Sequence, residues 1–214
     1  MSDRPSEMAR FAHLILMGLW GTNQRMQYPS LIEPLISKKV VYKGKYIQTE
    51  EHVVLQPDGN KALREIVTPP NAVGIFPIDP DETVYLVRQY RPAIQQITLE
   101  IPAGVLDPGE QPRDTALREC EEEIGVTASK MDFLFSYFHS VGFSTGKIDI
   151  FMATDFRPAP NAHTDPGEFI EKVAMPFDEL YKKCTDGTVI DSKTLLAVFW
   201  YLQRVRNPSP PTPP

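Results

Sequence analysis

The chain is 214 residues long, with 42% hydrophobic residues, 23% charged residues and a formal net charge of -6. This length supports one hydrophobic core with a smaller appended element rather than two full domains. The negative charge argues against a protein that binds nucleic acid through a basic face. The two cysteines, Cys120 and Cys184, have neither a metal-ligand spacing nor the density of a disulfide framework, which is typical of a reducing cytoplasm.

No stretch of the sequence approaches the length of a membrane span, so no membrane partner is expected. The apolar run at residues 11–20 contains His13 and lacks a small-residue cleavage site. We therefore expect a helix that docks on the core or on a partner rather than a signal peptide. Residues 207–214 are mostly proline and predict an extended, disordered tail.

Three short β-prone runs joined in part by a turn at residues 57–60 predict a small antiparallel unit: residues 40–47, 52–56 and 62–67. Further β-prone runs predict a larger sheet: residues 72–77, 83–90, 97–101, 132–139, 148–154 and 170–176. Helical patterns cover residues 112–124, 177–184 and 192–205. These elements predict an N-terminal arm with the antiparallel unit (1–68), an α/β body (69–206) and the tail (207–214).

Residues 104–126 carry the most informative spacing in the sequence. Gly104 is followed after five residues by Glu110 and after seven more by Arg118, and the segment closes with Gly125 and a valine. A proline early in the segment suits the first turn of a helix, and the final glycine is a good helix stop.

The helix expected over residues 112–124 places Glu119, Glu122 and Glu123 on one face. Glu119 and Glu123 stand one turn apart, and such like charges weaken a helix unless a cation neutralises them. Carboxylates without histidine or cysteine favour Mg²⁺, with Mn²⁺ as a substitute, over zinc. The alternative is a solvated acidic helix face, which would not need the glycine and arginine at fixed offsets.

The spacing of residues 104–126 resembles the Nudix box. The runs VRQYRP at residues 87–92 and LEIPAG at 99–104 are similar to the ADP-ribose pyrophosphatase and nucleoside diphosphate sugar hydrolase branch of the Nudix hydrolase superfamily. The resemblance implies an α/β fold, the Nudix α/β/α sandwich with a mixed sheet, over residues 69–206. It also implies a homodimer in which the small N-terminal antiparallel β unit is swapped between subunits.

The resemblance implies four ligands for Mg²⁺: Glu119, Glu122, Glu123 and the carbonyl of Ala103. Glu119 and Glu122 are also expected to take part in catalysis. In this branch a carboxylate on the loop before residue 169 completes the metal site or activates water. The chain offers Asp165 and Glu168 there, of which Glu168 is the favoured base.

The resemblance also implies substrate contacts. Arg91 and the partner's Arg64 are expected to hold the diphosphate or the terminal sugar through bidentate hydrogen bonds. Glu100 is expected to contact the nucleoside or the terminal ribose, and Arg118 to orient a box carboxylate such as Glu110. A tyrosine is expected to stack on the base, unless these strand residues are buried instead: Tyr42, Tyr46 and Tyr90.

The implied reaction is hydrolysis of the diphosphate bond of nucleoside diphosphate sugars such as ADP-ribose, which yields a nucleoside monophosphate and a sugar phosphate. Val141 stands where enzymes devoted to ADP-ribose carry proline, so related sugars such as GDP-mannose are expected as substrates too. His139 and His163 are expected to be surface or hydrogen-bonded residues rather than bases. Two alternatives remain: a Nudix hydrolase of nucleoside triphosphates, dinucleoside polyphosphates or capped RNA, and a non-catalytic nucleotide-sugar-binding regulator.

Overall fold

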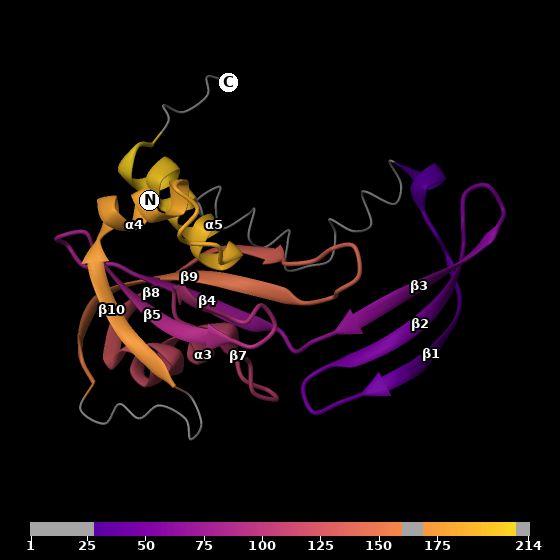
Figure 1. Cartoon of the computed structure of the whole chain (residues 1–214), viewed down its shortest axis with the longest axis horizontal. Coiled ribbons are helices and arrows are strands. Elements are labelled where there is room, and N and C mark those ends of the chain that lie inside the picture. The colour runs from indigo at the N-terminus through magenta and orange to yellow at the C-terminus, as the bar shows by residue number, and fades with distance from the viewer. Residues whose placement is uncertain (1–27, 160–168, 209–214) are drawn as a thin grey trace, which may run out of the picture. The chain divides into compact units, whose positions relative to one another are not determined.

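The computed structural model describes residues 28–159 and 169–208 (Figure 1). His163, Asp165, Glu168 and residues 11–20 lie outside the described residues, so the expectations attached to them stay predictions. The described residues form two compact units. One comprises residues 28–69 with Ser140–Thr145, and the other comprises Pro70–His139 with residues 146–159 and 169–208.

The first unit is an antiparallel sheet of order β1-β2-β3. Its elements are a 3₁₀ turn η1 (Pro29–Leu31), β1 (Leu35–Lys43), β2 (Gln48–Leu55) and β3 (Lys61–Thr68). The predicted antiparallel unit is therefore confirmed, although its first strand lies earlier than residues 40–47. The strand ends at Lys43 because the chain turns there, with the Gly44 amide donating a hydrogen bond to the Ile47 carbonyl (2.9 Å).

The second unit contains two sheets, of order β10-β5-β6 and β7-β4-β9-β8. Its first strands are β4 (Ala72–Pro77), β5 (Thr83–Arg91), β6 (Gln96–Glu100) and β7 (Ala103–Val105). The later elements are α3 (Pro112–Glu119), η2 (Cys120–Ile124), β8 (Val126–Phe138), β9 (Lys147–Pro158), β10 (Ile170–Pro176), α4 (Phe177–Thr185), α5 (Ser192–Tyr201) and η3 (Leu202–Arg206). Strands β4 and β9 pair in parallel and the other described pairs are antiparallel, so the expected mixed sheet is present.

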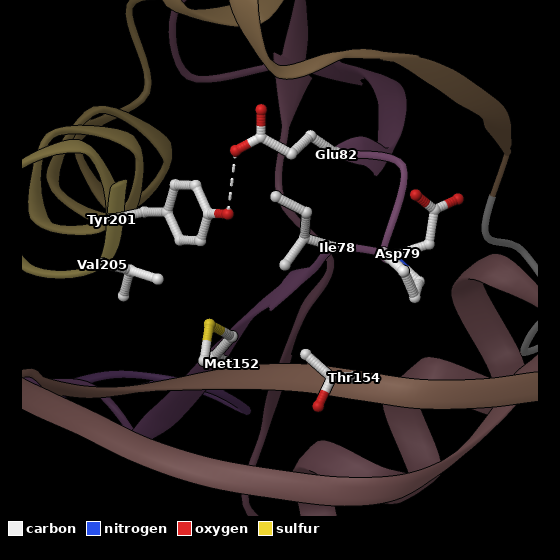
Figure 2. Close-up of a pocket in the computed structure, with 8 residues that line it drawn as sticks. Ile78, Asp79, Glu82, Met152, Thr154, Tyr201 and Val205 are labelled. Carbon is white, nitrogen blue, oxygen red and sulfur yellow. Dashed lines mark hydrogen bonds between the residues drawn. The ribbon is translucent and has the colours of Figure 1, made fainter. Parts of the chain in front are cut away.

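Helix α5 is tied to the turn between β4 and β5. Tyr201 donates a hydrogen bond to Glu82 (3.1 Å; Figure 2). Arg206, in the η3 turn that follows α5, lies 3.4 Å from the same carboxylate. A pocket of about 220 Å³ beside this contact is lined by Ile78, Asp79, Pro80, Glu82, Met152, Thr154, Tyr201 and Val205. Asp79 accepts hydrogen bonds from two backbone amides of its own turn. Both acidic groups of the pocket are therefore bonded within the fold, where they stabilise the turn.

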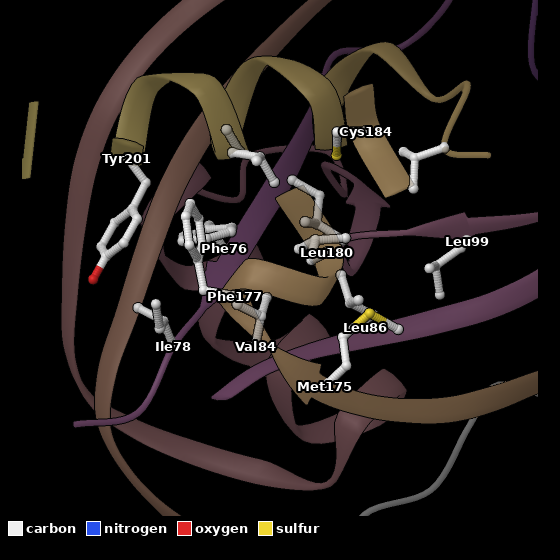
Figure 3. Close-up of a cluster of buried hydrophobic side chains, with 14 of the residues drawn as sticks. Phe76, Ile78, Val84, Leu86, Leu99, Met175, Phe177, Leu180, Cys184 and Tyr201 are labelled. Carbon is white, nitrogen blue, oxygen red and sulfur yellow. The ribbon is translucent and has the colours of Figure 1, made fainter. Parts of the chain in front are cut away.

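Side chains from the two faces of the sheets pack into separate cores. Val73 and Ile75 of β4 lie in one cluster with side chains of α3. On the opposite face Phe76 packs against Phe177 of α4 and Tyr201 of α5, with ring centroids 6.4 and 5.3 Å away (Figure 3). Since neighbouring strand residues alternate between faces, α3 covers one face and α4 and α5 cover the other. The expected mixed α/β fold is confirmed, with several sheets and with helices packed on both faces of β4.

The helix after the glycine loop differs from the single α-helix expected over residues 112–124. The α-helix ends at Glu119, and the chain continues as the π-helical turn η2. Gly125 closes this turn with φ 74°, and its amide donates to the carbonyls of Cys120 and Glu121. A π turn is wider than an α turn, so the carboxylates it carries do not keep the α-helical spacing that the sequence predicts.

Candidate active site

The glycine loop brings its backbone directly against two buried carboxylates. The Ala103 amide donates a hydrogen bond to Glu123 Oε2 (2.8 Å). A Cβ built on Gly104 would lie 1.7 Å from Glu119 Oε1, so only glycine leaves room for that carboxylate. Glu119 and Glu123 are 7% and 4% exposed. The spacing between Gly104 and Glu119 in the sequence therefore corresponds to a close backbone-to-carboxylate contact.

Arg118 gathers three carboxylates of the same segment. Its Nη1 donates to Glu119 Oε1 (2.7 Å) and Glu122 Oε2 (2.8 Å), and its Nε and Nη2 each lie 3.2 Å from a Glu110 oxygen. The hydrogen bonds to Glu110 raise the pKa of Arg118, assisted by the charge of Glu119. The same hydrogen bonds lower the pKa of Glu110 to about 2. Arg118 therefore bonds to Glu110, as expected, and also to Glu119 and Glu122, while its role in orienting them for catalysis stays a prediction.

The carboxylates Glu119, Glu122 and Glu123 have the chemistry of a site for a hard divalent cation, because all their donor atoms are oxygens. In the described part of the chain, however, no group of three or more histidine, cysteine, aspartate or glutamate side chains is arranged as a metal site. The guanidinium of Arg118, which bonds Glu119 and Glu122, holds those two carboxylates as a counter-charge. The four metal ligands implied by the sequence therefore stay a prediction.

Arg91 and Glu100 form a bidentate ion pair. Arg91 Nε donates to Glu100 Oε1 (2.7 Å) and Nη2 to Oε2 (2.6 Å). Glu100 is only 2% exposed, and it also accepts hydrogen bonds from Thr98 (2.5 Å) and Lys193. Because both of its oxygens are already engaged within the protein, the arrangement does not favour the predicted direct contact of Glu100 with a nucleoside. The Arg91 side chain, by contrast, is 42% exposed, so contact with a substrate stays a prediction for this residue.

Among the remaining residues predicted to contact substrate, the three tyrosines are exposed, and Arg64 is bonded to a glutamate. Tyr42, Tyr46 and Tyr90 are 55%, 66% and 57% exposed, so the alternative of buried strand tyrosines is wrong. Stacking on a base stays a prediction for all three. Arg64 forms a bidentate pair with Glu33 of its own chain (3.0 and 2.6 Å). Its predicted role across a dimer also stays untested.

The sequence did not predict that the N-terminus of α5 bonds to the chain just before the glycine loop. Asp191 caps this helix, accepting hydrogen bonds from the Thr194 amide (3.0 Å) and hydroxyl (2.6 Å). The Thr194 hydroxyl oxygen in turn accepts a hydrogen bond from the Ile101 amide (2.8 Å), inside the run that leads to the glycine loop. An aspartate before an apolar helical pattern is a readable capping signal. The contact with Ile101 could not be read from the sequence, because the two residues lie 93 positions apart.

The layered fold, the glycine loop and the arginine-bound carboxylates together define a Nudix-type hydrolase. The chain belongs to the NUDIX domain family, which it matches over residues 68–197. It is 36% identical to the methanol dehydrogenase activator of Bacillus methanolicus, over 80% of this chain and 92% of that protein. It is 34% identical to the ADP-ribose pyrophosphatase of Bacillus subtilis, over 81% of this chain and 94% of that protein.

A crystal structure of an ADP compounds hydrolase has a similar fold, with a TM-score of 0.71 over 78% of this chain and 91% of that chain, at 24% identity. At that identity the likeness concerns the fold alone. Within the described residues, no helix is both long enough and apolar enough to cross a membrane.

Proposed function

We propose that this protein is a divalent-metal-dependent pyrophosphohydrolase that cleaves the diphosphate of ADP-ribose and related nucleoside diphosphate sugars. The observation that carries the proposal is the contact of the glycine-loop backbone with Glu119 and Glu123, beside Arg118. Relatives that bear the name ADP-ribose pyrophosphatase in Bacillus subtilis and Mycobacterium tuberculosis, at 34% and 30% identity, support the substrate class.

The residues that would hold Mg²⁺, or Mn²⁺ in its place, are Glu119, Glu122, Glu123 and the carbonyl of Ala103. Their all-oxygen donor set fits a hard cation, and the two most buried carboxylates already lie against the loop. When bound, such a cation supplies charge neutralisation at the diphosphate and lowers the pKa of a coordinated water.

The protein's own groups would position the substrate and the attacking water. Arg91 presents a half-exposed guanidinium that can bind the diphosphate by charge-assisted hydrogen bonds. Glu168 is our candidate for the base that takes the proton from water, with Asp165 as the other loop carboxylate. The water oxygen forms a new bond to one phosphorus, and the bridging P–O bond breaks. The products are a nucleoside monophosphate and a sugar phosphate, which for ADP-ribose are AMP and ribose 5-phosphate.

We also propose a cytoplasmic homodimer in which the N-terminal sheet is exchanged between subunits and the partner's Arg64 reaches the substrate. All nine residues of β1 are exposed in the single chain, including Leu35, Val40 and Tyr42. A strand that exposes large apolar side chains on both faces is typical of a surface covered by another chain. Dimerisation would therefore support the active site as well as the fold.

A second candidate function is activation of a partner enzyme. A relative that is 36% identical over 92% of its own length is named methanol dehydrogenase activator. The intact box carboxylates favour hydrolysis as the primary activity, because a protein that only binds a partner needs no buried acidic cluster beside a glycine loop.

The test is Mg²⁺-dependent turnover of ADP-ribose, ADP-glucose, GDP-mannose, UDP-glucose, a dinucleoside polyphosphate and dGTP, with phosphate released by a coupled phosphatase. Glu119→Gln should abolish turnover. Glu121→Gln is the matched control, since Glu121 is exposed and bonds only to Thr127 at 2.8 Å among the contacts found for it. Activity on dGTP or the polyphosphate alone would move the protein to another Nudix branch, and inactivity on the whole panel would favour the activator.

A further inference from the structure

The side chain of Lys193 is buried beneath the Arg91–Glu100 pair. This lysine, in the first turn of α5, is only 7% exposed at its side chain. Its Nζ contacts Glu100 Oε2 and lies 3.1 Å from Asp191 Oδ1. Its aliphatic stem passes over Gly74, where a built Cβ would stand 3.6 Å from Lys193 Cδ. A buried ammonium is costly unless it is paired, so this placement is tied to the two carboxylates.

Glu100 is the point where Lys193 and Arg91 meet. Its Oε2 accepts hydrogen bonds from both cations, and its Oε1 accepts them from Arg91 and Thr98. Burial alone would raise the pKa of Glu100. The hydrogen bonds from Arg91 and the charge of Lys193 outweigh that effect and lower the pKa to about 2. Glu100 is therefore an anion held by two cations on different elements of the fold.

Arg91 is the member of this network that reaches solvent. Its pKa is raised chiefly by its hydrogen bonds to Glu100, and also by the charges of Asp191 and Glu123. Lys193 and Arg91 are matched in charge by Glu100 and Asp191, so Lys193 adds no net positive charge to the network. Its contribution is to hold the Glu100 carboxylate in place, and through that carboxylate the orientation of Arg91.

We propose that Lys193 is a positioning residue, which through Glu100 holds the Arg91 guanidinium in the orientation that receives the substrate diphosphate. The inference rests on the proposed function, because it needs a diphosphate substrate at Arg91. Two contacts connect Lys193 and Glu100 to the glycine loop. Helix α5, which carries Lys193, is bonded to the chain just before the loop by the Thr194–Ile101 hydrogen bond. Glu100 lies a few residues before Ala103 and Gly104, which contact Glu123 and Glu119.

The test compares Lys193→Met with Lys193→Arg, and uses Lys183→Met as the matched control. Lys183 lies on α4, where its ion-pair partner is Glu179 at 3.4 Å. Because Arg91 binds the diphosphate before and during the reaction, Lys193→Met should raise KM for ADP-ribose about tenfold or more and change kcat less than about threefold. Lys193→Arg should recover at least part of the affinity, and Lys183→Met should leave KM unchanged.

A double-mutant cycle with Arg91→Gln separates positioning from general damage. If Lys193 acts through Arg91, adding Lys193→Met to Arg91→Gln should raise KM less than about twofold further, because coupled residues are not additive. If the two substitutions raised KM by the product of their separate factors, the inference would be overturned. An unchanged KM in folded Lys193→Met would also overturn it. If Lys193→Met does not fold, Thr98→Val takes its place, because it removes one hydrogen bond to Glu100 without changing the charge. Thr98→Val should raise KM by a smaller factor in the unmodified protein, and it should not raise KM in the Arg91→Gln variant.

The two proposals fail differently. An unmodified protein that turns over no diphosphate sugar overturns the proposed function and this inference together. An active protein whose KM is insensitive to Lys193→Met and to Thr98→Val overturns this inference alone.

Discussion

Replacing Gly104 with alanine tests the contact on which the proposed active site depends. The new Cβ would stand 1.7 Å from Glu119 Oε1 and 2.0 Å from its Cδ, closer than real Cβ contacts allow. The carboxylate, which is 7% exposed and 2.7 Å from Arg118 Nη1, would have to retreat by about 1 Å or more. Misplacement on that scale can cost roughly 100-fold in rate, so we expect Gly104→Ala to lower kcat/KM by about that factor.

The assay is Mg²⁺-dependent turnover of the best substrate of the panel, with thermal unfolding measured on the same samples. Gly142→Ala is the matched control, because a Cβ at Gly142 meets no heavy atom within 4 Å. It should leave both readings close to those of the unmodified protein. A folded Gly104→Ala protein whose kcat/KM stays within about threefold of the unmodified protein would refute the argument that glycine makes room for the Glu119 carboxylate.

Three further predictions follow from the charges and burial in the same unit. Arg118→Gln should weaken Mg²⁺ activation by about tenfold or more, read as the Mg²⁺ concentration for half-maximal rate, because it releases three carboxylates that Arg118 now holds; an unchanged concentration would contradict this. Glu100 has its pKa lowered from 4.5 to about 2, so it contributes about 3 kcal/mol to folding above pH 4.5, and this contribution is lost as the pH falls from 4.5 towards 2. Denaturant unfolding across this range should therefore show a pH slope that Glu100→Gln reduces. Burial raises the pKa of Cys120 to about 12 and of Cys184 to about 11, so a thiol reagent at pH 8 should label neither cysteine until the protein is unfolded.

The sequence predicts best those strands whose apolar residues are bounded by clear breakers. The strands at residues 72–77 and 170–176 are found within those limits as β4 and β10. Strand β8 begins at Val126, six residues before the predicted start at residue 132. Gly125 reverses the chain at once, and the polar residues that follow it hide the strand pattern. The π turn after Glu119 was not predictable either, because its residues also fit an α-helix.

The residues of the candidate site likewise differ in how far the sequence predicts them. The box carboxylates and the arginine that holds them follow from fixed local offsets, which a sequence displays directly. Lys193 does not, because a lysine in the first turn of a helix usually lies in water. Its burial depends on Gly74 leaving space above β4 and on Glu100 lying beneath α5, and both are long-range consequences of the fold.

The central claim is tested most directly by identifying the products of ADP-ribose in the presence of Mg²⁺. Phosphorus NMR or chromatography should show AMP and ribose 5-phosphate in equal amounts from the unmodified protein. The same products should come from Glu121→Gln, and none should come from folded Glu123→Gln. Undiminished product formation by Glu123→Gln, or intact ADP-ribose with the unmodified protein, would contradict the account.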